Sequence, residues 1–168
     1  MTAHNESTSQ TVQLTINGEK HVYEVDADET LMKTLRNNGY YEVKNGCSEG
    51  VCGACNVIVD GNRVLRSCVI TTTSLDGSDI MTVDYLSDGD NLHPLQEEFL
   101  SHGAAQCGFC IPGMLLSAYN LLENNRDPSR AEIKKQINGN VCRCTGYDQQ
   151  IEAIQSAAER LRESESKA

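Results

Sequence analysis

Eight cysteines are the residues of this sequence whose type and spacing predict chemistry most directly. Four lie in the first half of the 168-residue chain and four in the second. Residues 1–13 are polar and lack the apolar core of an export signal, so we expect a cytoplasmic protein with reduced thiols. Metal ligation is then favoured over a disulfide framework, with four thiolates at each of two sites. The cysteines are Cys47, Cys52, Cys55, Cys68, Cys107, Cys110, Cys142 and Cys144.

The first four cysteines have the spacing C-x4-C-x2-C, followed by a fourth cysteine after twelve residues. This opening is the spacing of plant-type ferredoxins, which bind a [2Fe–2S] cluster. A loop that supplies three ligands must bend sharply and bring backbone N–H groups toward negatively charged sulfur. Gly46, Gly50 and Gly53 remove the side chains that would block this approach. Cys68 would close the site from a separate strand.

The other four cysteines form a C-x2-C pair and a C-x-C pair. Cys107 and Cys110 come just before a helix that Pro112 begins, and Cys142 and Cys144 lie in the turn before the last helix. The N-terminus of a helix offers free N–H groups and a positive dipole end, and both stabilise thiolates. The second set therefore predicts another anionic cluster.

Three other uses of these cysteines fit the sequence less well. A structural zinc site with four cysteines usually has two C-x2-C hooks, whereas each set here has one. A thioredoxin-like site would place its C-x2-C pair in a parallel βαβ pattern, which is absent around both pairs. A Rieske centre replaces two cysteines by histidines. Eight cysteines already fill two sites, so we interpret the histidines, including His93 and His102, as surface or packing residues.

The overall charge narrows the possible partners. The net charge of −10 argues against nucleic acid, whose binding depends on Lys and Arg that neutralise phosphates. The acidic excess is typical of a solvated surface and is also compatible with docking to a basic partner. No stretch of the sequence reaches the ~20 apolar residues of a membrane span. We therefore predict neither a nucleic-acid partner nor a membrane span.

The first half of the chain has the pattern of a small mixed sheet with one helix. Alternating residues predict strands over 11–17 and 21–25, joined at Asn17-Gly18, a strong hairpin signal. Asp28 can cap a helix that carries Leu31, Met32 and Leu35 and that Gly39 ends. A second hairpin is predicted over residues 57–68 and a further strand over 80–83.

The second half predicts four helices. They are expected over residues 94–100, from Pro112 to 122, from a Ser129 capping box to 137, and over 149–161. Four helices favour a bundle. The sequence thus predicts an α+β chain with a flexible segment at 1–10, a ferredoxin-like domain at 11–86, a helical domain at 87–162 and a flexible tail at 163–168.

Three motifs resemble those of a known family over nearly the whole chain. They are GCSEGVCGAC at residues 46–55, QCGFCIPG at 106–113 and GNVCRCTGY at 139–147. On these motifs, the sequence resembles the small iron–sulfur subunits of the molybdenum hydroxylases, the family of xanthine oxidase, aldehyde oxidoreductase and CO dehydrogenase. The resemblance implies a β-grasp ferredoxin domain followed by a four-helix bundle, each holding one [2Fe–2S] cluster.

The resemblance also implies a direction of electron flow and a set of partners. Electrons would pass from a molybdopterin centre on a large subunit to the helical-domain cluster, and then to the ferredoxin-domain cluster. FAD on a medium subunit is the usual acceptor, although some relatives lack that subunit, and the complex would be a dimer of heterotrimers. Gln106 and Cys144 would contact the molybdopterin. No residue of this chain would be catalytic.

A free two-cluster ferredoxin that shuttles electrons between separate partners is the alternative function. A shuttle needs only the first domain, whereas about half of this chain forms the helical part that carries the second set of cysteines. The helical half therefore favours the subunit of a stable complex.

Overall fold

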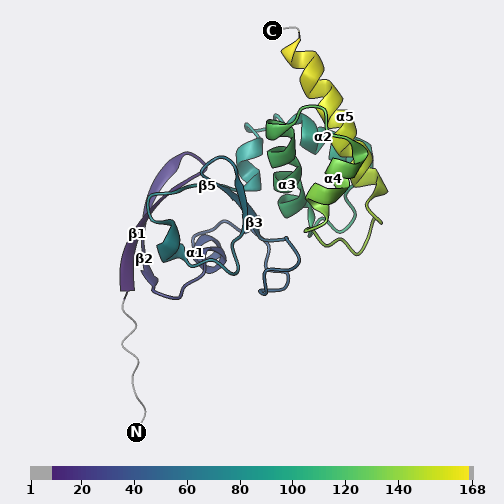
Figure 1. Cartoon of the computed structure of the whole chain (residues 1–168). Helices are drawn as coiled ribbons and strands as arrows, with labels where there is room; N and C mark the ends of the chain where they lie inside the picture. Colours follow the sequence, from purple (N-terminus) through teal and green to yellow (C-terminus); the bar gives the residue numbers. More distant parts are fainter. Residues whose placement is uncertain (1–8, 167–168) are drawn as a thin grey trace.

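The computed structural model describes residues 9–166, in which a five-stranded mixed sheet is followed by a helical region (Figure 1). The sheet has the order β2-β1-β5-β3-β4, with β1 and β5 parallel and the other neighbouring pairs antiparallel. The strands are β1 (Ser9–Ile16), β2 (Glu19–Asp26), β3 (Asn56–Val59), β4 (Arg63–Arg66) and β5 (Asp79–Met81).

The first hairpin forms as the sequence predicts. Val12, Leu14 and Ile16 alternate into the core along β1, while Asn17 and Gly18 both have positive φ in the turn, as a tight two-residue hairpin requires. The hairpin begins earlier than expected, because Ser9 already pairs with β2. Residues 9 and 10 are therefore part of the sheet, and the rest of the predicted flexible segment, residues 1–8, lies outside the described residues.

The helix of the first half is α1 (Leu31–Asn37), and its cap differs from the prediction. Asp28 lies in a turn, and the N-cap is Thr30, whose Oγ1 accepts a hydrogen bond from the N–H of Lys33 at 3.4 Å. The last strand is also shorter than predicted. β5 ends at Met81 because the Asn17 side chain takes the N–H of Thr82 at 2.8 Å, and a 3-10 helix follows from Val83 to Leu86.

The second half contains four α-helices, as the sequence predicts. They are α2 (Pro94–Ser101), α3 (Ile111–Asn124), α4 (Arg130–Ile137) and α5 (Asp148–Glu165). The Ser129 capping box with Glu132 is confirmed, whereas Pro112 is the second residue of its helix rather than the first. Packing of the four as a regular bundle stays a prediction. None of the helices described is both long enough and apolar enough to cross a membrane.

The final helix continues beyond its predicted end. The sequence predicts a flexible tail from residue 163, but α5 runs to Glu165. Arg162 donates to the carbonyl oxygen of Arg126 at 3.1 Å, and Arg126 in turn forms a 3.0 Å ion pair with Glu165. These contacts hold the last turn of α5 against the loop between α3 and α4. Residues 167–168 lie outside the described part of the chain.

β3 joins the two halves, because every one of its side chains is buried. Val57 and Val59 face the core that contains α1, whereas Ile58 points into the core of the helical half. Successive residues of a strand point to opposite faces, so one strand can belong to two cores. The sheet therefore has α1 on one side and the helical region on the other.

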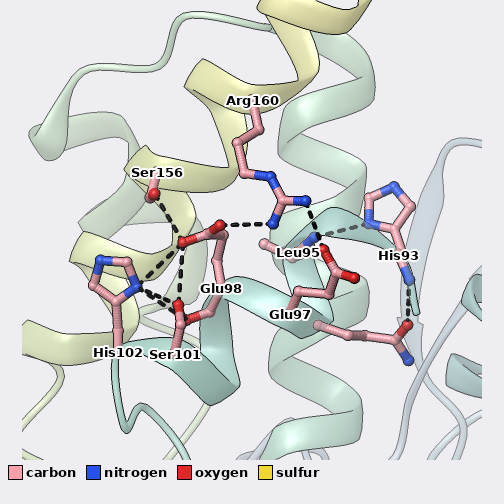
Figure 2. A network of polar contacts seen from close by, with 9 residues as sticks. His93, Leu95, Glu97, Glu98, Ser101, His102, Ser156 and Arg160 are labelled. Carbon is pink, nitrogen blue, oxygen red and sulfur yellow. Dashed lines mark hydrogen bonds and ion pairs between the residues drawn. The ribbon is translucent and has the colours of Figure 1, made fainter. Parts of the chain in front are cut away.

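A network of hydrogen bonds and ion pairs links α2 to α5 (Figure 2). The Glu98 side chain is buried to 11% exposure and accepts hydrogen bonds from Arg160 at 2.7 Å and Ser156 at 2.8 Å, both on α5. Ser101, one turn further along α2, donates to the same carboxylate at 3.2 Å. His93 caps α2, and its Nδ1 accepts from the N–H of Leu95, which agrees with a packing role for this histidine.

Candidate metal centres

The first cysteine loop, residues 45–55, is shaped by glycines at the positions the sequence indicates. Gly50 and Gly53 both have φ of +70°, a conformation that other residues rarely adopt. Gly46 is needed for space instead, because a Cβ on it would lie 2.8 Å from Sγ of Cys52. The loop can therefore fold tightly around its own sulfurs.

Backbone N–H groups of this loop point at sulfur. The N–H of Glu49 lies 3.4 Å from Sγ of Cys47, and the N–H of Gly50 lies 3.3 Å from Sγ of Cys68, which follows β4. Cys47 and Cys52 lie close enough to affect the pKa of Cys47, and Cys55 likewise affects the pKa of Cys68. The structure thus brings the first four predicted ligands together as two neighbouring pairs.

The surroundings of Cys47 and Cys68 shift the pKa values of these two thiols in opposite directions. N–H groups of Glu49, Cys52 and Val51 lower the pKa of Cys47 to about 6. Burial, followed by the neighbouring Cys55, raises the pKa of Cys68 to about 11. The backbone of the loop therefore favours the thiolate at Cys47, whereas a thiolate at Cys68 needs a bound cation to be stable.

The second set of cysteines also forms two neighbouring pairs. Sγ of Cys144 lies 3.6 Å from Sγ of Cys107, and Cys142 lies close enough to Cys110 to affect its pKa. Burial raises the pKa of Cys110 to about 12, and the neighbouring Cys142 adds to that effect. Burial also disfavours the thiolate of Cys142, but the hydroxyl of Thr145 and nearby N–H groups outweigh it and lower its pKa to about 7.

Two residues without a predicted role support the last cysteine loop, residues 139–147. Tyr147 has a φ of +74°, and its hydroxyl accepts from the N–H of Cys142 at 2.7 Å and donates to the carbonyl of Asn140 at 3.1 Å. Gln150 is fully buried and its Nε2 lies 3.1 Å from the carbonyl of Ala104 and 3.7 Å from Sγ of Cys142. No local sequence signal marks Gln150 as a support of the loop, because its partners lie 46 and 8 residues away.

Gln106 and Cys144 lie on one exposed part of the helical half. Both residues are exposed, and Gln106 directly precedes Cys107, whose sulfur contacts that of Cys144. The predicted molybdopterin contacts are therefore close to each other at the surface.

The donor set at each site fits a two-iron cluster better than a single ion. Among residues 9–166, no three His, Cys, Asp or Glu side chains are arranged to hold one metal ion. A tetrahedral zinc site gathers four ligands around one centre. A [2Fe–2S] cluster instead takes two cysteines on each iron, which matches two pairs of neighbouring cysteines.

Comparison with known proteins agrees with this geometry. Residues 14–87 match the family described as "2Fe-2S iron-sulfur cluster binding domain", and residues 82–155 match "[2Fe-2S] binding domain". The chain is 46% identical over 158 residues to the small subunit of nicotine 6-hydroxylase from Paenarthrobacter nicotinovorans, with 94% of each chain covered. The chain belongs to the small iron–sulfur subunits of the molybdenum hydroxylases.

Similar proteins occur both as separate subunits and within longer chains. The structure of quinoline 2-oxidoreductase from Pseudomonas putida 86 matches with a TM-score of 0.88 and 41% identity over 95% of this chain and 99% of that one. Aldehyde oxidoreductase from Megalodesulfovibrio gigas is 45% identical over 86% of this chain, which spans only 16% of that protein. These matches confirm the predicted family and the α+β fold with a ferredoxin-like first domain. The chain is the iron–sulfur, electron-transferring subunit of an oxidoreductase with two [2Fe–2S]-binding domains.

Proposed function

We propose that the eight cysteines are the ligands of the two clusters, one quartet for each cluster. The proximity of the cysteines supports a further assignment, in which each neighbouring pair holds one iron. The pairs would be Cys47 with Cys52, Cys55 with Cys68, Cys107 with Cys144, and Cys110 with Cys142. We also propose that the two domains divide near residue 86, where the two family matches overlap.

The residues of this chain hold the clusters in place and set how readily they are reduced. A [2Fe–2S] cluster, when bound, takes up and releases one electron. N–H groups directed at Cys47 and Cys68 stabilise negative charge on sulfur. Gln150 and Thr145 do the same at Cys142. Such hydrogen bonds and the exclusion of water are the means by which a protein tunes a cluster potential.

The partner proposal follows from the exposed surface and from the names of the relatives. Gln106 and Cys144 would contact the molybdopterin of a large subunit, and their exposure next to the second quartet supports this. Electrons would then pass from the second quartet to the first and on to FAD of a medium subunit, in a cytoplasmic dimer of heterotrimers. Relatives named as small subunits support this role over a free ferredoxin shuttle.

Low-temperature EPR of the reduced complex, together with iron and molybdenum analysis, tests the ligand assignment. We expect two distinct [2Fe–2S] signals and four irons per chain, since two clusters carry two irons each. Cys110→Ser should remove one signal and Cys47→Ser the other. Val51→Ala, at an exposed residue of the first cysteine loop, is the control and should keep both. Zinc in place of iron, or both signals surviving in C110S, would contradict the assignment.

Single-turnover reduction by substrate tests the order of the sites. In C47S, the second cluster should still be reduced by substrate while the external acceptor receives no electrons. In C110S, electrons should fail to leave the molybdenum site. If the two variants lost both steps equally although each kept its remaining cluster, the proposed order would be wrong.

A further inference from the structure

The two cysteine quartets are joined by a direct backbone hydrogen bond. The N–H of Val141 donates to the carbonyl oxygen of Cys52 at 2.9 Å. Within residues 9–166, this is the one backbone–backbone hydrogen bond between the first and the last cysteine loops. Cys52 belongs to the first quartet, and Val141 is bonded directly to Cys142 of the second. A continuous path of covalent bonds and one hydrogen bond therefore connects the two sites.

Asn140 holds this hydrogen bond in place. Its side chain is almost fully buried, at 2% exposure, and its Nδ2 donates to the carbonyl of Gly53 at 3.2 Å. Its Oδ1 accepts from the hydroxyl of Ser117 on α3 at 2.8 Å, and Ser117 accepts in turn from Asn56 on β3. A buried amide left without partners is costly, so both ends of Asn140 fix its orientation. The residue beside Val141 is thereby tied to the residue beside Cys52.

We propose that Asn140 is a positioning residue for electron transfer between the two clusters, because it keeps the Val141–Cys52 hydrogen bond formed. The inference rests on the proposed function, which places one cluster on each quartet. One electron leaves the second site, which is oxidised, and enters the first, which is reduced. No bond breaks and no proton moves in this step.

The ring of Phe109 offers a competing contact between the same sites. Phe109 lies between Cys107 and Cys110, and a Cβ on Gly46 would be 3.5 Å from its Cε1 and 2.8 Å from Sγ of Cys52. The ring is 47% exposed and carries no polar group, so it cannot add a hydrogen bond to the first loop. The bonded path through Val141 is therefore favoured, and Phe109→Leu distinguishes the two routes.

The test compares Asn140→Asp with Asn138→Asp in the full-length chain with both clusters. N140D replaces the donor to Gly53 by a second oxygen, whereas Asn138 is an exposed asparagine of the same segment, with no side-chain hydrogen bond among the described residues. We expect N140D to keep both EPR signals. Electron transfer between the clusters after flash photoreduction should be slower in N140D than in both the wild type and N138D, because the bonded path is no longer held.

Two further readouts are independent of activity. The magnetic interaction between the two clusters in the fully reduced chain should weaken in N140D, and the amide hydrogen of Val141 should exchange faster with solvent. Ser117→Ala should shift both in the same direction by a smaller amount, since Asn140 keeps its bond to Gly53. N138D should match the wild type in every measurement.

The outcomes separate this inference from the proposed function. Wild-type transfer rate and magnetic interaction in an N140D chain with both clusters would overturn the inference and leave the proposed function intact. Slower transfer in F109L but not in N140D would assign the path to the ring instead. Loss of a cluster in both N140D and S117A would also overturn the inference, because Asn140 would then be a structural support of the site. A wild-type chain without two clusters would refute the proposed function itself.

Discussion

A Cβ on Gly113 would lie 2.0 Å from the carbonyl oxygen of Gly53, so the first turn of α3 rests directly on the first cysteine loop. Gly113 itself has no positive φ, and its role is therefore to allow close approach. Gly53 is crowded from the other side as well, because its own Cβ would meet the carbonyl of Gly139 at 2.4 Å. The three glycines allow three chain segments to meet between the two sites.

Gly113→Ala should therefore destabilise the chain strongly although it adds a single methyl group. The group it meets is a backbone carbonyl, which cannot rotate away, so we expect a loss near the upper end of overpacking, about 3 kcal/mol. Gly103→Ala is the control, because Gly103 has open space around it and a φ of +61°, and conformational strain alone costs about 1 kcal/mol. Thermal unfolding of both variants measures the difference. Equal midpoints would refute the close-contact explanation.

Tyr147→Phe should disturb the second site and spare the first. The change leaves the N–H of Cys142 and the carbonyl of Asn140 without the hydroxyl that pairs with both, at a cost of about 1–3 kcal/mol. We expect a changed EPR signal and potential for the second cluster only. Tyr85→Phe removes an exposed hydroxyl with no hydrogen bond among residues 9–166 and is the control. An unchanged EPR signal of the second cluster in Y147F would argue against a supporting role for the Tyr147 hydroxyl.

The sequence predicted most elements and singled out the eight cysteines as candidate ligands, because those signals are local. The C-x4-C-x2-C spacing, the Asn17-Gly18 turn and the Ser129 capping box each lie within a few residues. The supports of the sites were not predictable in this way. Asn140 bonds to a residue 87 positions earlier, and Gln150 to one 46 positions earlier, so their roles exist only after the halves have packed.

The N-cap of α1 also shows the limit of local sequence signals. The assignment of the cap to Thr30 can be tested. Both Asp28 and Thr30 are good N-cap residues by type, and the turn that contains Asp28 decides in favour of Thr30. Thr30→Ala should cost about 1 kcal/mol through loss of the cap. Asp28→Ala should stay within about 0.5 kcal/mol of the wild type, as is usual for surface changes. Chemical denaturation measures both, and the reverse order would restore Asp28 as the cap.

The Glu98 network predicts a stability difference that depends on pH (Figure 2). Burial by itself raises the pKa of Glu98, but hydrogen bonds from Arg160, Ser156 and Ser101 outweigh it and leave the pKa below its ordinary value of 4.5. A carboxylate with a lowered pKa in the folded state stabilises the fold fully above its unfolded pKa. That contribution is lost as the pH falls through the folded pKa.

Arg160→Ala should therefore destabilise the chain at pH 7 by about 1–2 kcal/mol, since the buried carboxylate loses its charged partner while exposure of Arg160 weakens the pair. Arg63→Ala breaks an exposed pair with Asp60 and should destabilise the chain less than Arg160→Ala does. The difference between wild type and R160A in thermal unfolding should shrink as the pH is lowered below about 4.5, because Glu98 then becomes protonated in both proteins. A difference that stayed constant from pH 7 to pH 4 and below would mean that Arg160 acts through packing of its stem rather than through the charge of Glu98.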